Sequence, residues 1–67
     1  MILWNDVALI IQRKRIMKNI SLKKAASDLS INMFKYYRIE NGVQEPNFFE
    51  LQLIFEYYDI ELIINFP

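Results

Sequence analysis

Apolar side chains recur at helical spacing near the start of the chain, where positions i, i+3 and i+4 are Val7, Ile10 and Ile11. This spacing predicts a first helix that turns these side chains toward the core and runs to about residue 18. Asn5 or Asp6 can cap its beginning, because a short polar side chain accepts hydrogen bonds from free backbone N–H groups. Asn19 can end the helix in the left-handed conformation.

Two shorter helices are predicted next, with a tight break between them. Ser21 can cap a second helix over residues 22–29, whose inward positions are Ala25, Ala26 and Leu29. Residues 30–32 form the break, and Asn32 is a good cap for a third helix over residues 33–41. Gly42, the only glycine in the chain, stops that helix.

A fourth helix is predicted from Asn47, its cap, through about residue 58. One face carries Phe48, Leu51, Ile54, Phe55 and Tyr58, and another carries Phe49, Leu53 and Tyr57. We expect the core to centre on Tyr36, Ile39, Leu51, Ile54 and Phe55.

The last segment, residues 60–66, alternates in polarity and is rich in β-branched residues, so it predicts a strand. No other segment resembles a strand, and unpaired backbone groups need partners, so we expect it to pair with the same strand of a second copy. A fifth short helix packed on the fourth is the alternative. The expected fold class is therefore all-α, a single domain over residues 1–67 with four helices and a C-terminal dimerisation strand.

The composition narrows the chemistry available to the chain. With 67 residues and neither cysteine nor histidine, it has no disulfides, no usual zinc ligands and no common nucleophile-base pair. We therefore expect no enzyme activity, no metal and no cofactor, and a small core that association supplements. Residues 1–6 lack a basic region and a long apolar run, so we expect neither signal peptide nor membrane partner, and a cytoplasmic location.

Charge is strongly polarised along the sequence. Residues 1–39 carry eight basic and two acidic residues, a net charge of +6, while residues 40–67 carry six acids and no base, a net charge of −6. A basic half suits a polyanionic partner such as a nucleic acid. The alternative is that both sets of charges simply solvate helix surfaces.

Several residues at the predicted helix pair resemble the helix-turn-helix of lambda-repressor-like regulators, the Cro, phage-repressor and XRE type. They are Ile20-Ser21, Ala25-Ala26, Leu29, Ile31, Tyr36 and the run Arg38-Ile39-Glu40-Asn41-Gly42, followed by a proline before the fourth helix. The resemblance covers about residues 7–62 and places the helix-turn-helix at residues 21–41. It implies a homodimeric transcriptional regulator, a repressor or autorepressor, that binds double-stranded DNA sequence-specifically with its third helix in the major groove.

The resemblance also implies roles for individual residues. Ala26 would lie at the helix crossing, and Tyr36 and Ile39 would face inward. Arg15 would pair with Glu40 and point toward a phosphate, with a purely structural ion pair as the alternative. Residues facing base edges would be Asn32, Met33, Phe34, Lys35, Tyr37 and Arg38. Residues near phosphates would be Lys14, Arg15, Lys18, Ser21, Lys23 and Lys24.

The chain departs from the family at three positions of the DNA-facing surface. Relatives place polar side chains where this chain has Leu22, Met33 and Phe34. Apolar groups there can contact thymine methyls, while Lys35 and Arg38 can read guanine, which indicates an AT-leaning site. The same apolar side chains, with Tyr37, also suit a protein-binding module such as an antitoxin or an anti-repressor.

The C-terminal part resembles HipB-like antitoxins, in which an aromatic fourth helix leads into a strand that pairs across the dimer axis. The expected dimer interface is Phe49, Leu53, Tyr57, Leu62, Ile63, Ile64 and Phe66. A toxin is therefore a candidate partner, beside DNA and a second copy. Ser30 stands where relatives favour glycine and a positive φ is expected, at a cost of about 1 kcal/mol. Trp4 is expected to pack on the domain edge or on the dimer partner.

Overall fold

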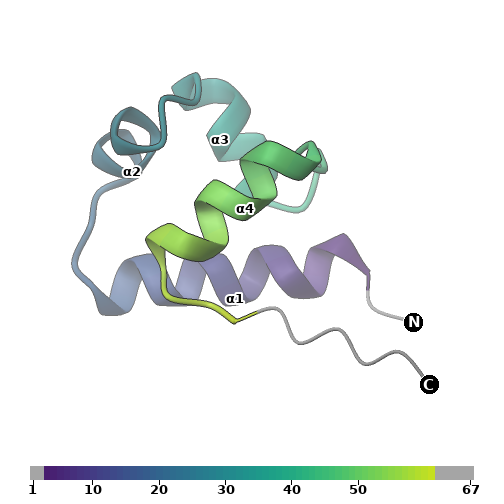
Figure 1. The fold of residues 1–67 in the computed structure, drawn as a ribbon, viewed down its shortest axis with the longest axis horizontal. Coiled ribbons are helices and arrows are strands. Elements are labelled where there is room, and N and C mark those ends of the chain that lie inside the picture. The colour runs from purple at the N-terminus through teal and green to yellow at the C-terminus, as the bar shows by residue number, and fades with distance from the viewer. Residues whose placement is uncertain (1–2, 62–67) are drawn as a thin grey trace.

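The computed structural model describes residues 3–61, which form four helices and no strand. The helices are α1 (Trp4–Met17), α2 (Leu22–Asp28), α3 (Met33–Glu40) and α4 (Phe48–Tyr57). In Figure 1, α1 forms one side of the molecule, and the other three helices lie together on the same side of it. The predicted all-α class and its four helices are confirmed.

Short polar side chains begin three of the helices at the predicted positions. The Ser21 hydroxyl and the Asn32 amide oxygen accept hydrogen bonds from backbone N–H groups two or three residues further on. Asn47 and Glu50 form a capping box, in which each side chain accepts from the other residue's backbone N–H at 2.8 and 2.9 Å. The ends of these helices are therefore set by local sequence.

The first helix begins earlier than predicted. Trp4 is its first residue, and Leu3 stands at the cap position without a side-chain cap, so the expected cap at Asn5 or Asp6 was wrong. The Trp4 indole Nε1 donates to the Ile39 carbonyl oxygen at 2.9 Å, which ties the first turn of α1 to α3. A tertiary contact, and not a side-chain cap, therefore holds the start of α1 in place against α3.

The inward face of α1 also differs from the predicted one. Ala8 and Ile11 are buried and Val7 is half-buried, while Ile10, which we expected to face inward, is exposed. The helix is rotated so that the small Ala8 side chain, and not Ile10, is buried. A small residue permits close approach of backbones, which the apolar pattern alone does not reveal.

Among residues 3–61, four residues adopt positive φ angles, and each lies where a helix ends: Asn19, Ser30, Gly42 and Asp59. Asn19 and Ser30 both have φ of 56°, as expected, whereas Asp59 was not anticipated. Gly42 has φ of 78°, and a Cβ atom there would lie 2.1 Å from the Asn5 side-chain oxygen. A side chain at position 42 would therefore be strained in this conformation and would force the Asn5 side chain to shift.

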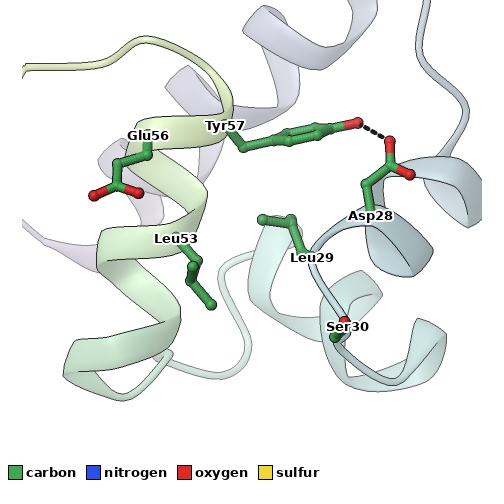
Figure 2. A pocket seen from close by; sticks show the side chains of 6 residues that line it. All are labelled: Asp28, Leu29, Ser30, Leu53, Glu56 and Tyr57. Carbon is green, nitrogen blue, oxygen red and sulfur yellow. Dashed lines mark hydrogen bonds between the residues drawn. The ribbon is translucent and has the colours of Figure 1, made fainter.

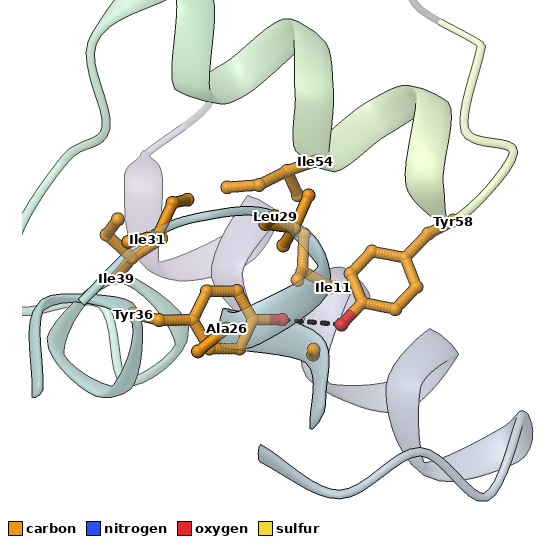
Figure 3. Packing of buried hydrophobic residues seen from close by; sticks show 9 residues of the cluster. Ile11, Ala26, Leu29, Ile31, Tyr36, Ile39, Ile54 and Tyr58 are labelled. Carbon is orange, nitrogen blue, oxygen red and sulfur yellow. Dashed lines mark hydrogen bonds between the residues drawn. The ribbon is translucent and has the colours of Figure 1, made fainter. Parts of the chain in front are cut away.

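All four helices contribute to one hydrophobic cluster (Figure 3). Its buried members are Ile11, Ala25, Ala26, Leu29, Ile31, Tyr36, Ile39, Ile54 and Tyr58. Leu51 and Phe55, which we expected at the centre, are only half-buried. Phe48, expected to face inward, is 67% exposed, because it is the first residue of α4 and the buried positions of that helix begin at Ile54.

The predicted strand lies mostly outside the described residues, since only residues 60 and 61 of its span belong to them. Neither is in a strand. The Ile60 backbone N–H donates to the Phe55 carbonyl oxygen at 2.8 Å, so Ile60 closes the end of α4. No helix within residues 3–61 is long and apolar enough to cross a membrane.

We predict that Gly42→Ala destabilises the fold by at least about 1–2 kcal/mol, the cost of a left-handed non-glycine residue. The clash with Asn5 adds to this cost. The free energy of unfolding in urea measures the effect. The double variant Asn5→Ala/Gly42→Ala should regain the stability that is lost to the clash with Asn5. It should keep the loss that is due to the left-handed conformation. An unchanged midpoint in Gly42→Ala would contradict this explanation.

Candidate functional site

The outward surface of the α2–turn–α3 unit holds most of the predicted site. Ala25 and Ala26 are buried, so α2 packs closely on α3, while Tyr36 and Ile39 anchor α3 from its inner side. The turn between the two helices uses the left-handed Ser30. Because these residues fix both helices, the outer face of α3 is presented on a stable base.

Three apolar side chains project from that outer face. Met33, Phe34 and Tyr37 are 40%, 67% and 54% exposed. Together with Leu22 at the start of α2 they line an open hollow of about 190 Å³, whose wall is wholly apolar. Exposed large apolar groups that gather at one place mark an interaction surface.

The polar side chains predicted to read bases already have partners within the chain. The Asn32 amide oxygen caps α3, and the Arg38 Nε donates to the Gln44 side-chain oxygen at 2.9 Å. The Lys35 ammonium lies 2.6 Å from a Glu50 carboxylate oxygen. These contacts use only part of each side chain, because the Arg38 Nη groups, the other N–H bonds of the Lys35 ammonium and the Asn32 NH2 group can still donate.

The Lys35–Glu50 pair joins α3 to the first turn of α4. Partial burial alone would raise the pKa of Glu50, but the Lys35 ammonium and the Asn47 N–H outweigh it and hold that pKa below its usual value. We did not identify Glu50 or Gln44 from the sequence as partners of the site. The capping-box spacing of Asn47 and Glu50 is a signal that could have marked Glu50 as a helix-start residue, but nothing local indicates its contact with α3.

The cations predicted to contact phosphates lie at the end of α1 and the start of α2. Lys18 contacts Asp59 at 3.4 Å and Lys24 contacts Asp28 at 3.3 Å, while Lys14 is half-buried. Such solvent-exposed ion pairs contribute little to the stability of the fold, so these lysines can bind another anion at low cost. Within residues 3–61, the exposed side chains of Lys23 and Arg13 form no ion pair. The Ser21 hydroxyl caps α2.

Arg15 and Glu40 form the ion pair that the sequence analysis expected. The Arg15 Nε donates to both Glu40 carboxylate oxygens at 3.0 and 2.9 Å, and Nη1 donates to the Ile20 carbonyl oxygen at 2.8 Å. The Glu40 side chain is only 1% exposed and that of Arg15 is 15% exposed. This contact fixes α1, α3 and the loop before α2 relative to one another.

Two tyrosine hydroxyls lie beside this pair inside the core. Tyr36 and Tyr58 share a buried hydrogen bond, which links α3 to the end of α4 (Figure 3). Burial, the hydrogen bond to Tyr58 and the Glu40 carboxylate hold the pKa of Tyr36 far above its usual value. Burial also raises the pKa of Tyr58. Both phenols therefore stay neutral at any ordinary pH.

A second surface lies on α4, where Phe48, Phe49 and Leu53 are exposed. Tyr57, predicted to join the same interface, instead donates its hydroxyl to Asp28 at 2.7 Å. Figure 2 shows this bond at the edge of a hollow of about 410 Å³. The hollow is lined by Asp28, Leu29, Ser30, Leu53, Glu56 and Tyr57. Burial and the Asp28 carboxylate raise the pKa of Tyr57 to about 12. The remaining predicted interface residues, 62–64 and 66, lie outside the described residues.

We predict that Glu40→Gln lowers the free energy of unfolding by about 3 kcal/mol, because it leaves the Arg15 guanidinium without its counter-charge in a mostly dry place. Urea unfolding measures the loss. Lys24→Ala, which removes an exposed pair, should cost less than about 1 kcal/mol. The double variant Arg15→Met/Glu40→Leu should regain part of the loss. Equal costs for Glu40→Gln and Lys24→Ala would show that the buried pair is unimportant.

Comparison with known proteins identifies no relative of this chain. No family model, no curated protein and no solved structure matches the chain.

Proposed function

We propose that the chain is a sequence-specific double-stranded DNA-binding protein that acts in the cytoplasm as a homodimeric transcriptional regulator. In this proposal α2, the turn and α3 form a helix-turn-helix of the lambda-repressor-like type, and the protein has no catalytic role. The observation that carries it is the exposed outer face of α3, which is fixed from behind by Tyr36, Ile39 and the Arg15–Glu40 pair.

The dimensions and the charges of this surface support a major-groove ligand. An α-helix with its side chains is about 10–12 Å in diameter, which fits a major groove about 12 Å wide, and α3 is exposed along its outer face. Lys18 follows the end of α1, and Lys23 and Lys24 lie at the start of α2, the first helix of the proposed helix-turn-helix. A polyanion that meets α3 would place phosphates near such cations.

The exposed apolar residues of α4 support association with a second copy. Phe48, Phe49 and Leu53 have little packing within the described chain, and exposed aromatic groups are typical of interface centres. A dimer would present two α3 helices to half-sites about one helical turn apart. The predicted strand pairing over residues 60–66 belongs to the same proposal.

A second candidate function is a protein-binding module, such as an antitoxin or an anti-repressor, on the same helical scaffold. It is favoured by the exposure of Met33, Phe34 and Tyr37 and by the engagement of Lys35 and Arg38 within the chain. A fold of this kind does not dictate its ligand. Binding of DNA with a steep salt dependence decides between the two candidates.

We predict that the protein binds its own upstream DNA in preference to a scrambled duplex, with an affinity that falls steeply with salt. Lys23→Ala should reduce the slope of log affinity against log salt by about 0.9, the value for one lost phosphate contact. Arg13→Ala is the matched control, because Arg13 is also exposed and forms no ion pair within residues 3–61, yet it is not expected to contact DNA. Fluorescence anisotropy at several salt concentrations gives both slopes. Negligible, equal binding to both duplexes would refute the proposal.

We predict that Phe49→Ala and Leu53→Ala each weaken the dimer at least about tenfold, as loss of a central interface contact of more than 1 kcal/mol implies. Sedimentation velocity over a range of concentrations measures the dissociation constant. Met17→Ala on α1 removes a side chain that is as exposed as Phe49 and should leave the constant unchanged. A wild-type protein that stays monomeric at high concentration would contradict the dimer.

A further inference from the structure

The hollow formed by Leu22, Met33, Phe34 and Tyr37 is an unusual feature for a surface that meets a charged polymer. Its wall is wholly apolar, and it opens at the junction of α2 and α3. Met33, Phe34 and Tyr37 remain exposed, whereas two other aromatic side chains, Tyr36 and Tyr58, are buried in the core. The ligand of this hollow must therefore offer apolar surface.

The residues that follow three of the lining residues in the chain are basic: Lys23 follows Leu22, Lys35 follows Phe34 and Arg38 follows Tyr37. The Glu50 carboxylate compensates the charge of Lys35. Arg38 bonds to the neutral Gln44, and Lys23 is exposed and forms no ion pair within residues 3–61, so both keep their charge. An apolar hollow on helices that carry these two cations complements a ligand that combines negative charge with exposed apolar groups.

Duplex DNA offers this combination in its major groove. The thymine 5-methyl group is the one apolar substituent on the base edges there, and phosphates border the groove on both sides. The hollow of about 190 Å³ has room for more than one methyl-sized group, since a water molecule of similar size occupies about 30 Å³. Neighbouring thymines can therefore share it.

The hollow is better placed than the polar side chains of α3 to distinguish one base from another. Asn32, Lys35 and Arg38 are bonded to the α3 backbone, to Glu50 and to Gln44. These contacts hold the Arg38 and Lys35 side chains toward Gln44 and Glu50 and so restrict the directions in which their remaining donors can point, whereas a methyl group that enters the hollow displaces only water.

We infer that this hollow is a thymine-methyl subsite, so that the protein selects DNA by the 5-methyl groups of consecutive thymines and not chiefly by hydrogen bonds to base edges. The inference rests on the proposed DNA-binding function and names the chemical group that the reading surface recognises. It follows that the methyl group, and not the A·T pair as such, carries the preference.

The test compares duplexes that differ only in 5-methyl groups. One pair is an A·T-rich duplex and the same duplex with deoxyuridine in place of thymidine, and the other is a G·C-rich duplex with cytosine or 5-methylcytosine. We expect each methyl group that enters the hollow to raise affinity about fourfold, the value for one buried carbon group. The gain should be present in both pairs, because both differ by the same substituent.

Variants separate the hollow from the rest of the surface. Phe34→Ala should reduce the affinity ratio of methylated to unmethylated DNA toward one. Met17→Ala is the control, because Met17 is an exposed apolar side chain, 77% accessible, that lies on α1 and belongs neither to the hollow nor to the proposed dimer surface. It should leave both affinities and their ratio unchanged.

Each outcome supports or overturns the inference. Affinity that depends on methyl groups in wild type and Met17→Ala but not in Phe34→Ala supports it. Salt-sensitive DNA binding with equal affinity for thymidine and deoxyuridine duplexes overturns the subsite and leaves the proposed function standing. Absence of binding to every duplex overturns both, and favours an acidic protein with apolar anchors as the ligand of the hollow.

Discussion

The buried carboxylate of Glu40 is the constraint on which the rest of the structure depends. A charge so far removed from water is tolerated only when it is paired and hydrogen-bonded. Arg15 satisfies both of its oxygens and at the same time binds the Ile20 carbonyl, so one guanidinium fixes α1, α3 and the loop before α2. The neutral hydroxyls of Tyr36 and Tyr58 pack beside it and extend the linkage to the end of α4. A small core is thus held in a single arrangement by polar contacts at its centre.

This arrangement gives α3 one face that is fully committed to the fold and another that is free. The outer face presents an apolar hollow, and α2 and α3 also carry the cations Lys23 and Arg38, so two physical tasks fall to different side chains. Charge attracts a polyanion with little regard to sequence, whereas apolar contacts distinguish one base edge from another by modest factors. Modest factors become useful when a dimer applies them twice. The exposed Phe49 and Leu53 of α4 therefore bear on specificity as much as on stability in our proposal.

Local sequence predicted much of this fold because helix ends are decided by short-range hydrogen bonds. Ser21, Asn32 and Asn47 each cap the helix expected of them, and Asn19 adopts the left-handed conformation that its side chain tolerates. The start of α1 was mispredicted for the complementary reason. No local cap sets it, and the Trp4 indole reaches a carbonyl 35 residues away instead.

The candidate site also combines features that local sequence predicts with features that depend on tertiary packing. The sequence by itself determined the four helices, the exposed apolar positions of α3 and the polarised charge, since these follow from residue type and spacing. Only the tertiary structure decided that Lys35 is held by Glu50 and Arg38 by Gln44, and that Leu22 closes an apolar hollow. Such contacts join side chains from different helices or from a helix and a loop, and their distances depend on how the helices pack, which no periodicity within one segment encodes.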